Sequence, residues 1–347
     1  VACCASGSSV TAGRSVAVLR VYLDQNKWID LARAATGHRD GARFVGALAS
    51  AQAAVASGTA SFPLDIYRYL ETARRADHRS RLDVADLMFE LSKQHAMARP
   101  HALLPAEIDR ALNRRFGRPE EPQQHPVFGT GLRHITAGGV TLPSFDPSRL
   151  PDSGKKLSPP ELITVERLFN DLAERELLRM GPATSRAAGF DPSSTDLAQR
   201  YVDYENSIAA AIRDQGLSGA LLDLAVRASD LGDIRPVVTE ALERIGMTWD
   251  GFIEGMGPTG IWQFMDDLPT RYVTNIMRSA KLRQSEQKWE LNDFNDIVAL
   301  PVAAGYCDVV VTEKQWVHRL RRGKVGQRYN TTLLSDTAAL VDVLAAA

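Results

Sequence analysis

The sequence predicts an α/β fold, with a central parallel sheet that is interrupted by a large helical insertion. Short apolar runs alternate with amphipathic, helix-like stretches over residues 15–112, and the same alternation returns over 266–347. Residues 113–265 instead combine loops rich in Pro, Gly and charge with helix patterns, and they contain no strand pattern. We expect residues 1–14, which are mostly small and polar, to form a flexible tail.

The first α/β segment opens on its most apolar stretch. Residues 16–23 are rich in Val and Leu, which is typical of a strand that is covered on both faces. Residues 26–36 place Trp28, Leu31 and Ala35 on one helical face. The expected elements that follow are a helix at 41–56, a short strand in TASFPLD (59–65), helices at 64–76 and 81–95, and a strand in HALLP (101–105).

The rest of the chain is expected to be helical up to its last segment. The Val-rich DVVVT (308–312) and TTLLS (331–335) favour two further strands, and the final residues favour a helix capped by Ser335 or Asp336. The expected helices before them lie at about 160–180, 195–214, 218–230 and 236–247 in the insertion, and at 268–284 and 291–306 beyond it.

Composition excludes several classes of protein. The chain has 347 residues, and its 41 basic and 42 acidic residues give a net charge of −1, so a polyanion partner must meet a local basic patch. The three cysteines form no zinc or disulfide pattern, which favours the cytoplasm. Since no apolar run reaches about 18 residues, we expect no membrane span.

Carboxylates stand at the ends of the predicted strands, where parallel sheets bind their ligands. Asp24 ends the first strand and Glu313 follows DVVVT, while Glu71 lies on a helix after TASFP and Asp293 and Asp296 share one face of another helix. Two unit charges about 4 Å apart repel by roughly 4 kcal/mol at an effective dielectric near 20, so such a cluster requires a cation. Oxygen ligands favour Mg²⁺ or Mn²⁺.

Each acid also has a structural interpretation. Asp24 and Asp293 could cap the helices that they precede or open, and Glu71 could be an ordinary surface residue. Glu313 could simply favour the dipole of the helix that it begins. The argument for a site therefore depends on the joint placement of these acids.

Four short motifs, LDQN, YLET, NDFNDIVALPVA and CDVVVTEKQW, occur in an order that resembles the PIN-domain nucleases over about 15–112 and 266–345. The resemblance implies a PIN-like three-layer fold and a metal-dependent ribonuclease, either a toxin or an RNA-processing or defence enzyme. It assigns Asp24, Glu71 and Asp296 to one Mg²⁺ or Mn²⁺, with Asp293 and Glu313 completing that site or holding a second ion. Asn26 and Thr312 would orient water or carboxylates.

The last motif departs from the family pattern. Members often carry the final Asp two residues after the Thr, where this chain has Lys314, and the acid here is Glu313. Asp308 is an alternative ligand.

Two basic clusters flank the acidic motifs and are candidate contacts for RNA phosphates. Solvated helix faces are the alternative interpretation, and Trp316 beside them could stack on a base or belong to the core. An antitoxin or a second copy could bind through the insertion. Rival functions are a DNA or flap nuclease and an inactive PIN-like interaction module. The cluster residues are Arg74, Arg75, Arg319, Arg321, Arg322 and Lys324.

Overall fold

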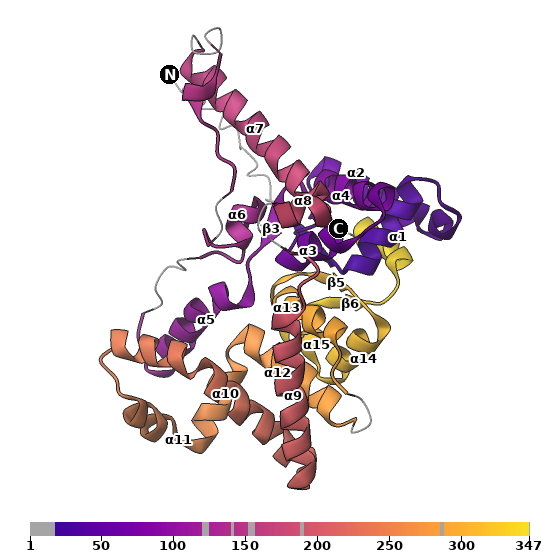
Figure 1. Cartoon of the computed structure of the whole chain (residues 1–347). Coiled ribbons are helices and arrows are strands. Elements are labelled where there is room, and N and C mark those ends of the chain that lie inside the picture. The colour runs from indigo at the N-terminus through magenta and orange to yellow at the C-terminus, as the bar shows by residue number, and fades with distance from the viewer. Residues whose placement is uncertain are drawn as a thin grey trace, which may run out of the picture.

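The computed structural model describes residues 18–119, 125–139, 142–151, 157–187, 191–284 and 288–346, so the predicted tail lies outside the described residues. The described chain is mostly helical and contains a small four-stranded parallel sheet (Figure 1). The predicted combination of a parallel sheet with helices is therefore present, with helices dominating. The strands run in the order β2 (Ala60–Ser61), β1 (Leu19–Leu23), β5 (Val309–Val311) and β6 (Thr332–Leu334).

The strands at the centre of the sheet are buried on both faces. Val21 and Leu23 of β1 enter one core with helices α1 (Gln25–Ala35), α2 (Val45–Ser57) and α4 (His78–Ser92). Tyr22, between them, enters a second core with α12 (Pro269–Leu282), α13 (Leu291–Tyr306) and α14 (Lys314–Arg322). Alternate residues of a strand point to opposite faces, so helices cover both sides of β1. This explains its nearly continuous apolar sequence.

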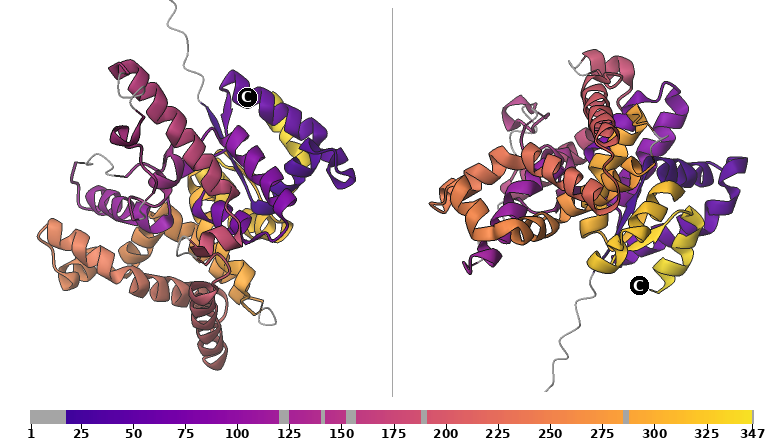
Figure 2. Two further views of the ribbon diagram at one scale, coloured as in Figure 1. Left: turned by 45° about the horizontal axis from the view of Figure 1, so that its top comes forward. Right: turned by 90° about the horizontal axis from the view of Figure 1, so that it is seen from below.

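The register of the sheet brings the two ends of the chain together. Val21 pairs with Val309 and Leu23 with Val311. The indigo and yellow segments accordingly lie against each other in both views of Figure 2. Because β1 and β5 are parallel, the residues that follow them, Asp24 and Thr312, emerge at the same edge of the sheet.

Two strand predictions are wrong. HALLP lies in helix α5 (Pro100–Arg115), which begins with Pro100 in its first turn, a position that suits proline. The strand lies just before it, as β3 (His95–Met97), and pairs antiparallel with β4 (Phe128–Thr130), inside the segment where no strand was expected. A parallel bridge from Leu64 to Ala96 joins β3 to the chain that follows β2.

The middle of the chain forms a helical body, and one helix replaces the two that were predicted around Pro236. Ile234 and Val238 on either side of this proline are both buried in a core shared with α5 and α11, so packing on one face outweighs the hydrogen bond lost at proline. The helices of this region are α6 (Gly131–Ile135), α7 (Pro159–Arg179), α8 (Pro182–Ala187), α9 (Asp196–Asp214), α10 (Gly219–Arg244) and α11 (Trp249–Asp266).

The short elements complete the two α/β segments. A 3-10 helix, η1 (Arg39–Phe44), precedes α2, and α3 (Ile66–Arg74) follows β2. The chain ends with α15 (Val325–Tyr329), η4 (Thr337–Ala339) and α16 (Leu340–Ala345), and η2 (Pro147–Arg149) lies in the middle region. Helix α5, which was assigned by sequence to the first α/β segment, shares its core with α10 and α11.

Among the described residues, none of the helices combines the length and the apolarity that crossing a membrane requires.

Candidate functional site

Asp24 lies at the carboxyl edge of the sheet, directly after β1, and is 6% exposed. Its Oδ1 accepts hydrogen bonds from the backbone N–H of Gln25 (2.7 Å) and from Arg68 Nη1 (2.5 Å). Its Oδ2 accepts a hydrogen bond from the Thr312 hydroxyl (3.0 Å). Asp24 is therefore the N-cap of α1, as the structural interpretation proposed, and also a member of a charged cluster.

The centre of this cluster is Arg68 of α3, whose side chain is 1% exposed. Besides Asp24, its guanidinium approaches Glu71 Oε1 (3.4 Å) and Asp65 Oδ2 (3.8 Å). Burial acts to lower the pKa of Arg68, but the neighbouring acidic groups, Tyr22 first among them, outweigh it and raise that pKa, so the guanidinium is charged. One cation thus contacts three carboxylates.

The sequence of α3 explains how these three groups meet. Asp65 caps the helix by accepting from the backbone N–H groups of Tyr67 and Arg68, and Arg68 and Glu71 follow at successive three-residue steps. Residues three apart lie on one face of a helix. The face therefore carries an acid, a base and an acid, and it points toward the end of β1.

Glu71 is not a plain surface residue. Its Oε1 accepts a hydrogen bond from Asn295 Nδ2 on α13 (2.7 Å), and its side chain is 21% exposed. Burial raises the pKa of Glu71, and the positive charge of Arg68 opposes that rise. The contact with Asn295 connects α3 to α13, which carries the next acid.

Asp296 of α13 is held by an indole. Its Oδ2 accepts a hydrogen bond from Trp316 Nε1 (2.6 Å), and Trp316 is fully buried in the core, so the core interpretation of this residue is the right one. The pKa of Asp296 is raised well above its usual value, first by burial and then by the negative charges of Asp24 and Glu313. Glu313, the N-cap residue of α14, is thus near enough to Asp296 for its charge to affect the pKa of that residue.

The carboxylate of Asp293, which the resemblance assigns as a further ligand, contacts residues outside the cluster. Its carboxylate forms a buried ion pair with Lys281 of α12 and accepts from the backbone N–H of Glu290 (2.7 Å) in the capping box that begins α13. Its role is the helix cap that the structural interpretation proposed. Asp308, the alternative ligand, precedes β5 and accepts from the backbone N–H of Arg20 (2.7 Å), so it lies at the opposite edge of the sheet from Asp24.

Of the two residues expected to orient water or carboxylates, Thr312 contacts the cluster and Asn26 does not hydrogen-bond to it. Thr312 is fully buried and donates to Asp24. Asn26 lies in the first turn of α1, and its buried Oδ1 has no hydrogen-bond partner in the described part of the chain. Gln25 Oε1 is also buried and has no hydrogen-bond donor among the described residues, whereas Asp65 Oδ2 lacks a hydrogen bond but lies 3.8 Å from the Arg68 guanidinium. The oxygens of Asn26 and Gln25 are thus left without a donor, which is costly unless water or a cation approaches them.

The donor atoms of the cluster suit a hard divalent cation, but its side chains are not positioned to surround one. The donors are oxygens, and the acids outnumber the guanidinium. As the described side chains lie, however, no group of three or more His, Cys, Asp or Glu is arranged to hold a metal ion. The Arg68 guanidinium is placed between Asp24 and Glu71, where it supplies positive charge itself.

Most of the predicted RNA-contacting residues have structural partners. Arg74 donates to the carbonyl of Pro192, and Arg75 Nη2 donates to Ser80 (2.6 Å). Arg319 is buried, with its guanidinium over the Trp316 ring (4.6 Å). Arg321 donates to the carbonyl of Leu333. Arg322 and Lys324 are exposed on α14 and the turn after it, so they remain candidates for phosphate contacts.

Sequence reasoning missed Arg68, Asp65, Asn295 and the role of Trp316. The Asp-x-x-Arg-x-x-Glu spacing at 65–71 was a readable signal for the first two, because it places the three side chains on one helical face. Asn295 and Trp316 carried no such signal.

Comparison of the chain with protein-family models, with curated proteins and with solved structures returned no match.

Proposed function

We propose that the chain is a divalent-metal-dependent ribonuclease of PIN-like fold, which hydrolyses RNA phosphodiester bonds at the acidic cluster. One observation carries the proposal: Asp24, Glu71, Asp296 and Glu313 come from four separate elements and gather at the carboxyl edge of β1 and β5. That edge is where open parallel sheets bind ligands. Helices on both faces of the sheet are consistent with the proposed fold.

Asp24, Asp296 and Glu313 are the residues that would hold Mg²⁺ or Mn²⁺, with Glu71 at their side. Such an ion supplies Lewis acidity and a water of lowered pKa when it is bound. Thr312 and Trp316 fix the orientation of Asp24 and Asp296 through their hydrogen bonds. An ion on Asp24 Oδ1 would replace the Arg68 guanidinium there, and a guanidinium displaced from Asp24 is suited to a phosphate oxygen.

The proposed partners follow from the same site. RNA would be held by the exposed Arg322 and Lys324 as well as by Arg68. A cytoplasmic location and a cognate antitoxin belong to the same proposal, and both rest on the resemblance of the sequence motifs alone.

The direct test is cleavage of matched RNA and DNA oligonucleotides with Mn²⁺, by the wild-type chain and by Asp24→Asn. We expect RNA cleavage to fall more than about 100-fold in Asp24→Asn. Mutating a residue that only hydrogen-bonds to a metal ligand already lowers activity about 10- to 100-fold, and loss of a ligand should cost more. Asp308→Asn is the matched control, an acid at the other edge of the same sheet, and it should cleave normally. Equal cleavage by wild type and Asp24→Asn would remove the assignment, and preference for the DNA strand would favour the DNA nuclease.

A second candidate function, a non-catalytic interaction module, is favoured by Arg68. The guanidinium already supplies a positive charge between Asp24 and Glu71, which reduces the repulsion between them without an ion. Titration with Mn²⁺, followed by melting temperature, separates the two functions. A ligand that binds the native state raises the melting temperature by mass action. A rise that Asp24→Asn abolishes supports the enzyme, and an unchanged melting temperature at millimolar Mn²⁺ supports the module.

A further inference from the structure

Glu174 of α7 is a buried acid with one oxygen that no donor of the described chain reaches. The residue is 7% exposed, and its Oε1 accepts hydrogen bonds from the Tyr69 hydroxyl of α3 and from the backbone N–H of Leu132 in α6 (3.0 Å). Its Oε2 accepts none, and no Lys or Arg among the described residues forms an ion pair with this carboxylate. Burial raises the pKa of Glu174, while the two hydrogen bonds oppose that rise.

The other buried acids of the described ranges have better compensated charges. Five of the other six contact an Arg or Lys side chain, and these five are Asp24, Asp65, Asp230, Asp293 and Glu205. The sixth, Glu107, accepts hydrogen bonds from Thr270 and Tyr306 through both of its oxygens. Glu174 therefore stands out in this set, because it has neither a cation nor donors on both oxygens. Burying such a charge is costly unless a partner binds it.

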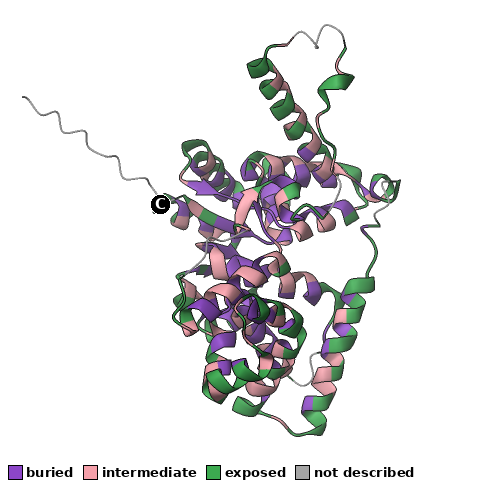
Figure 3. Cartoon of the chain, turned by 90° about the vertical axis from the view of Figure 1, so that its left-hand side faces the viewer, coloured by how far each residue is buried: buried purple, intermediate pink, exposed green. Residues whose placement is uncertain are grey.

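Glu174 lines a cavity of about 400 Å³ beside α7. In Figure 3 the first half of this helix projects with exposed faces, whereas its second half, which carries Glu174, packs against the protein. Gly131 at the start of α6 keeps the space beside the free oxygen open. Its φ is +67°, and a Cβ at this position would lie 2.9 Å from Glu174 Oε2. Protein atoms do not fully enclose Oε2, so a ligand in the cavity can reach it.

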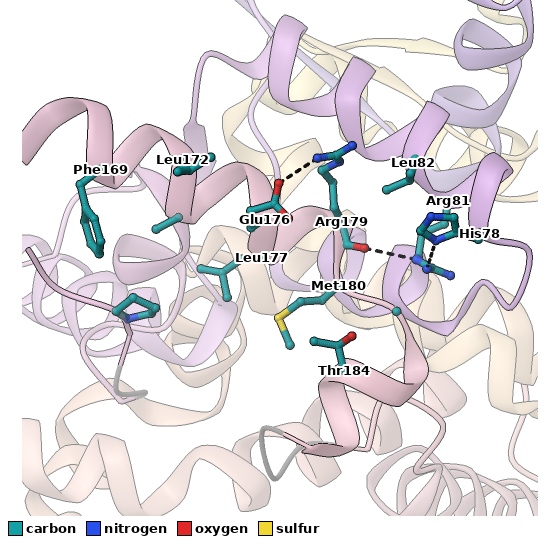
Figure 4. A pocket seen from close by; sticks show the side chains of 13 residues that line it. His78, Arg81, Leu82, Phe169, Leu172, Glu176, Leu177, Arg179, Met180 and Thr184 are labelled. Carbon is teal, nitrogen blue, oxygen red and sulfur yellow. Dashed lines mark hydrogen bonds and ion pairs between the residues drawn. The ribbon is translucent and has the colours of Figure 1, made fainter.

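Apolar side chains line the same cavity. Leu142, Phe145 and Leu177 supply this surface. Leu177 also lines a neighbouring cavity of about 640 Å³, shown in Figure 4, where Glu176 is already paired with Arg179. The smaller cavity thus combines apolar surface with an unpaired buried carboxylate, and the larger one does not. This combination is typical of a site that binds a small molecule with one polar group.

The charges of the smaller cavity favour a cationic ligand. Its charged lining residues are one base and two acids, Arg133, Glu166 and Glu174, so its net charge is negative. Arg133 and Glu166 are exposed and therefore hydrated, whereas the charge of Glu174 is withdrawn from water. A positively charged N–H donor would satisfy Oε2 and offset the buried charge at the same time.

We propose that this cavity binds a small organic cation, a primary amine on a short apolar body, with its ammonium group on Glu174 Oε2. An ammonium group has three donors, and the hydroxyls of Thr130 and Ser144, which line the same cavity, are acceptors for the others. The apolar body lies against Leu142 and Leu177. The site shares no residue with the acidic cluster at the sheet edge, and the proposal does not depend on nuclease activity.

The first test compares two probes on the wild-type full chain by isothermal titration calorimetry at neutral pH. Phenethylamine is a cation there, because the pKa of an alkyl ammonium is about 10, and phenethyl alcohol is its uncharged counterpart of similar shape. We expect the amine to bind at least about 10-fold more tightly, since hydrogen bonds to charged groups are stronger than neutral ones. Equal affinity for the two probes, or no binding of the amine at millimolar concentration, overturns the proposal.

The second test asks which carboxylate binds the amine. Glu174→Gln keeps the shape of the side chain and an oxygen that accepts from Tyr69 and Leu132, but it replaces Oε2 with an N–H donor. Its affinity for phenethylamine should fall about 10-fold or more. Glu176→Gln, two residues along the helix in the neighbouring cavity, is the matched control and should bind as the wild type does. Unchanged affinity in Glu174→Gln, or equal loss in both variants, rejects the assignment, and the comparison of probes on the wild type does not depend on either variant.

Discussion

Two groups of buried charges occupy different parts of this protein, and they are balanced in different ways. In the helical body, Glu205 of α9 pairs with Arg278 of α12 (2.8 Å), and Asp230 of α10 pairs with Arg271 and accepts from Asn275 Nδ2 (2.9 Å). Each acid there has a guanidinium of its own. At the sheet edge, the single guanidinium of Arg68 contacts Asp24, Asp65 and Glu71.

The difference separates a structural cluster from a candidate site. The paired cluster joins three helices, and it has no excess charge that another ion would neutralise. The Arg68 cluster has an excess of acids, increased by Asp296 and Glu313 nearby. Because burying unpaired charge is costly, an excess of this kind is retained where it binds something. The contrast predicts that a divalent ion stabilises one cluster and not the other.

The largest expected effect is that of Arg68→Met. Removing one partner of a buried ion pair typically costs about 3–5 kcal/mol, and here three acids lose their cation together. We expect a large loss of stability in EDTA, measured by urea unfolding. Mn²⁺ should restore much of it, and should raise the melting temperature of Arg68→Met more than that of the wild type, because the guanidinium no longer competes for Asp24.

Arg68→Lys is the companion variant for the case in which Arg68→Met does not fold. It keeps the positive charge but cannot contact Asp24 and Glu71 with two separate nitrogens. Its stability in EDTA and its response to Mn²⁺ should lie between those of the wild type and Arg68→Met. If Mn²⁺ raises the melting temperature of none of the three proteins, the acids do not form an ion site.

The next effect concerns the paired cluster. Arg278→Met leaves Glu205, which is 1% exposed, without its guanidinium, and should also cost about 3–5 kcal/mol. The measurement is again urea unfolding with and without Mn²⁺. Here we expect no recovery with the ion, since Asp230 keeps Arg271. Recovery equal to that of Arg68→Met would show that Mn²⁺ acts on the protein generally, and the comparison between the clusters would fail.

Local patterns in the sequence were enough to predict the sheet and most helices. The apolar run before Asp24, DVVVT and TTLLS became β1, β5 and β6, because a strand covered on both faces needs continuous apolar residues. HALLP failed because its two leucines belong to a helix that Pro100 begins, where Leu103 enters the core on one face of the sheet and Leu104 enters the core shared with α10 and α11. The helix across Pro236 was missed because tertiary packing, which no local pattern records, outweighed the helix-breaking residue.

Only those residues of the candidate site that directly follow a strand could be predicted from the sequence. Asp24 and Thr312 meet because β1 and β5 are parallel neighbours. The strand pattern predicts that each residue follows a strand, but the sequence does not show that the two strands are adjacent. The partner of Asp293 was not predictable, because its spacing from Asp296 fixes a shared helical side but not which carboxylate turns to Lys281. Arg68 was missed because a basic residue was not expected among ligands, although its spacing from Glu71 was visible in the sequence.

The smallest expected effect is on Asp296 of α13, whose replacement should increase the stability of the protein, while replacement of Asp293 on the same helix should decrease it. The raised pKa of Asp296 means that the folded state binds its proton more tightly than the unfolded state does. Above the ordinary carboxyl pKa of about 4, unfolding therefore becomes easier as pH rises toward the raised value. Asn cannot ionise and can still accept from Trp316, so Asp296→Asn should be more stable than the wild type at neutral pH in EDTA, by about 1 kcal/mol.

Asp293→Asn is its matched control, one turn away. It breaks the buried pair with Lys281, so it should lose about 3 kcal/mol at neutral pH while keeping the Mn²⁺ response, which Asp296→Asn should lose. Urea unfolding between pH 4 and pH 8, with EDTA or Mn²⁺, measures both. If Asp296→Asn is destabilised like Asp293→Asn and keeps the ion response, then Asp296 is another structural acid, and the excess charge at the sheet edge shrinks to the three carboxylates that Arg68 already contacts.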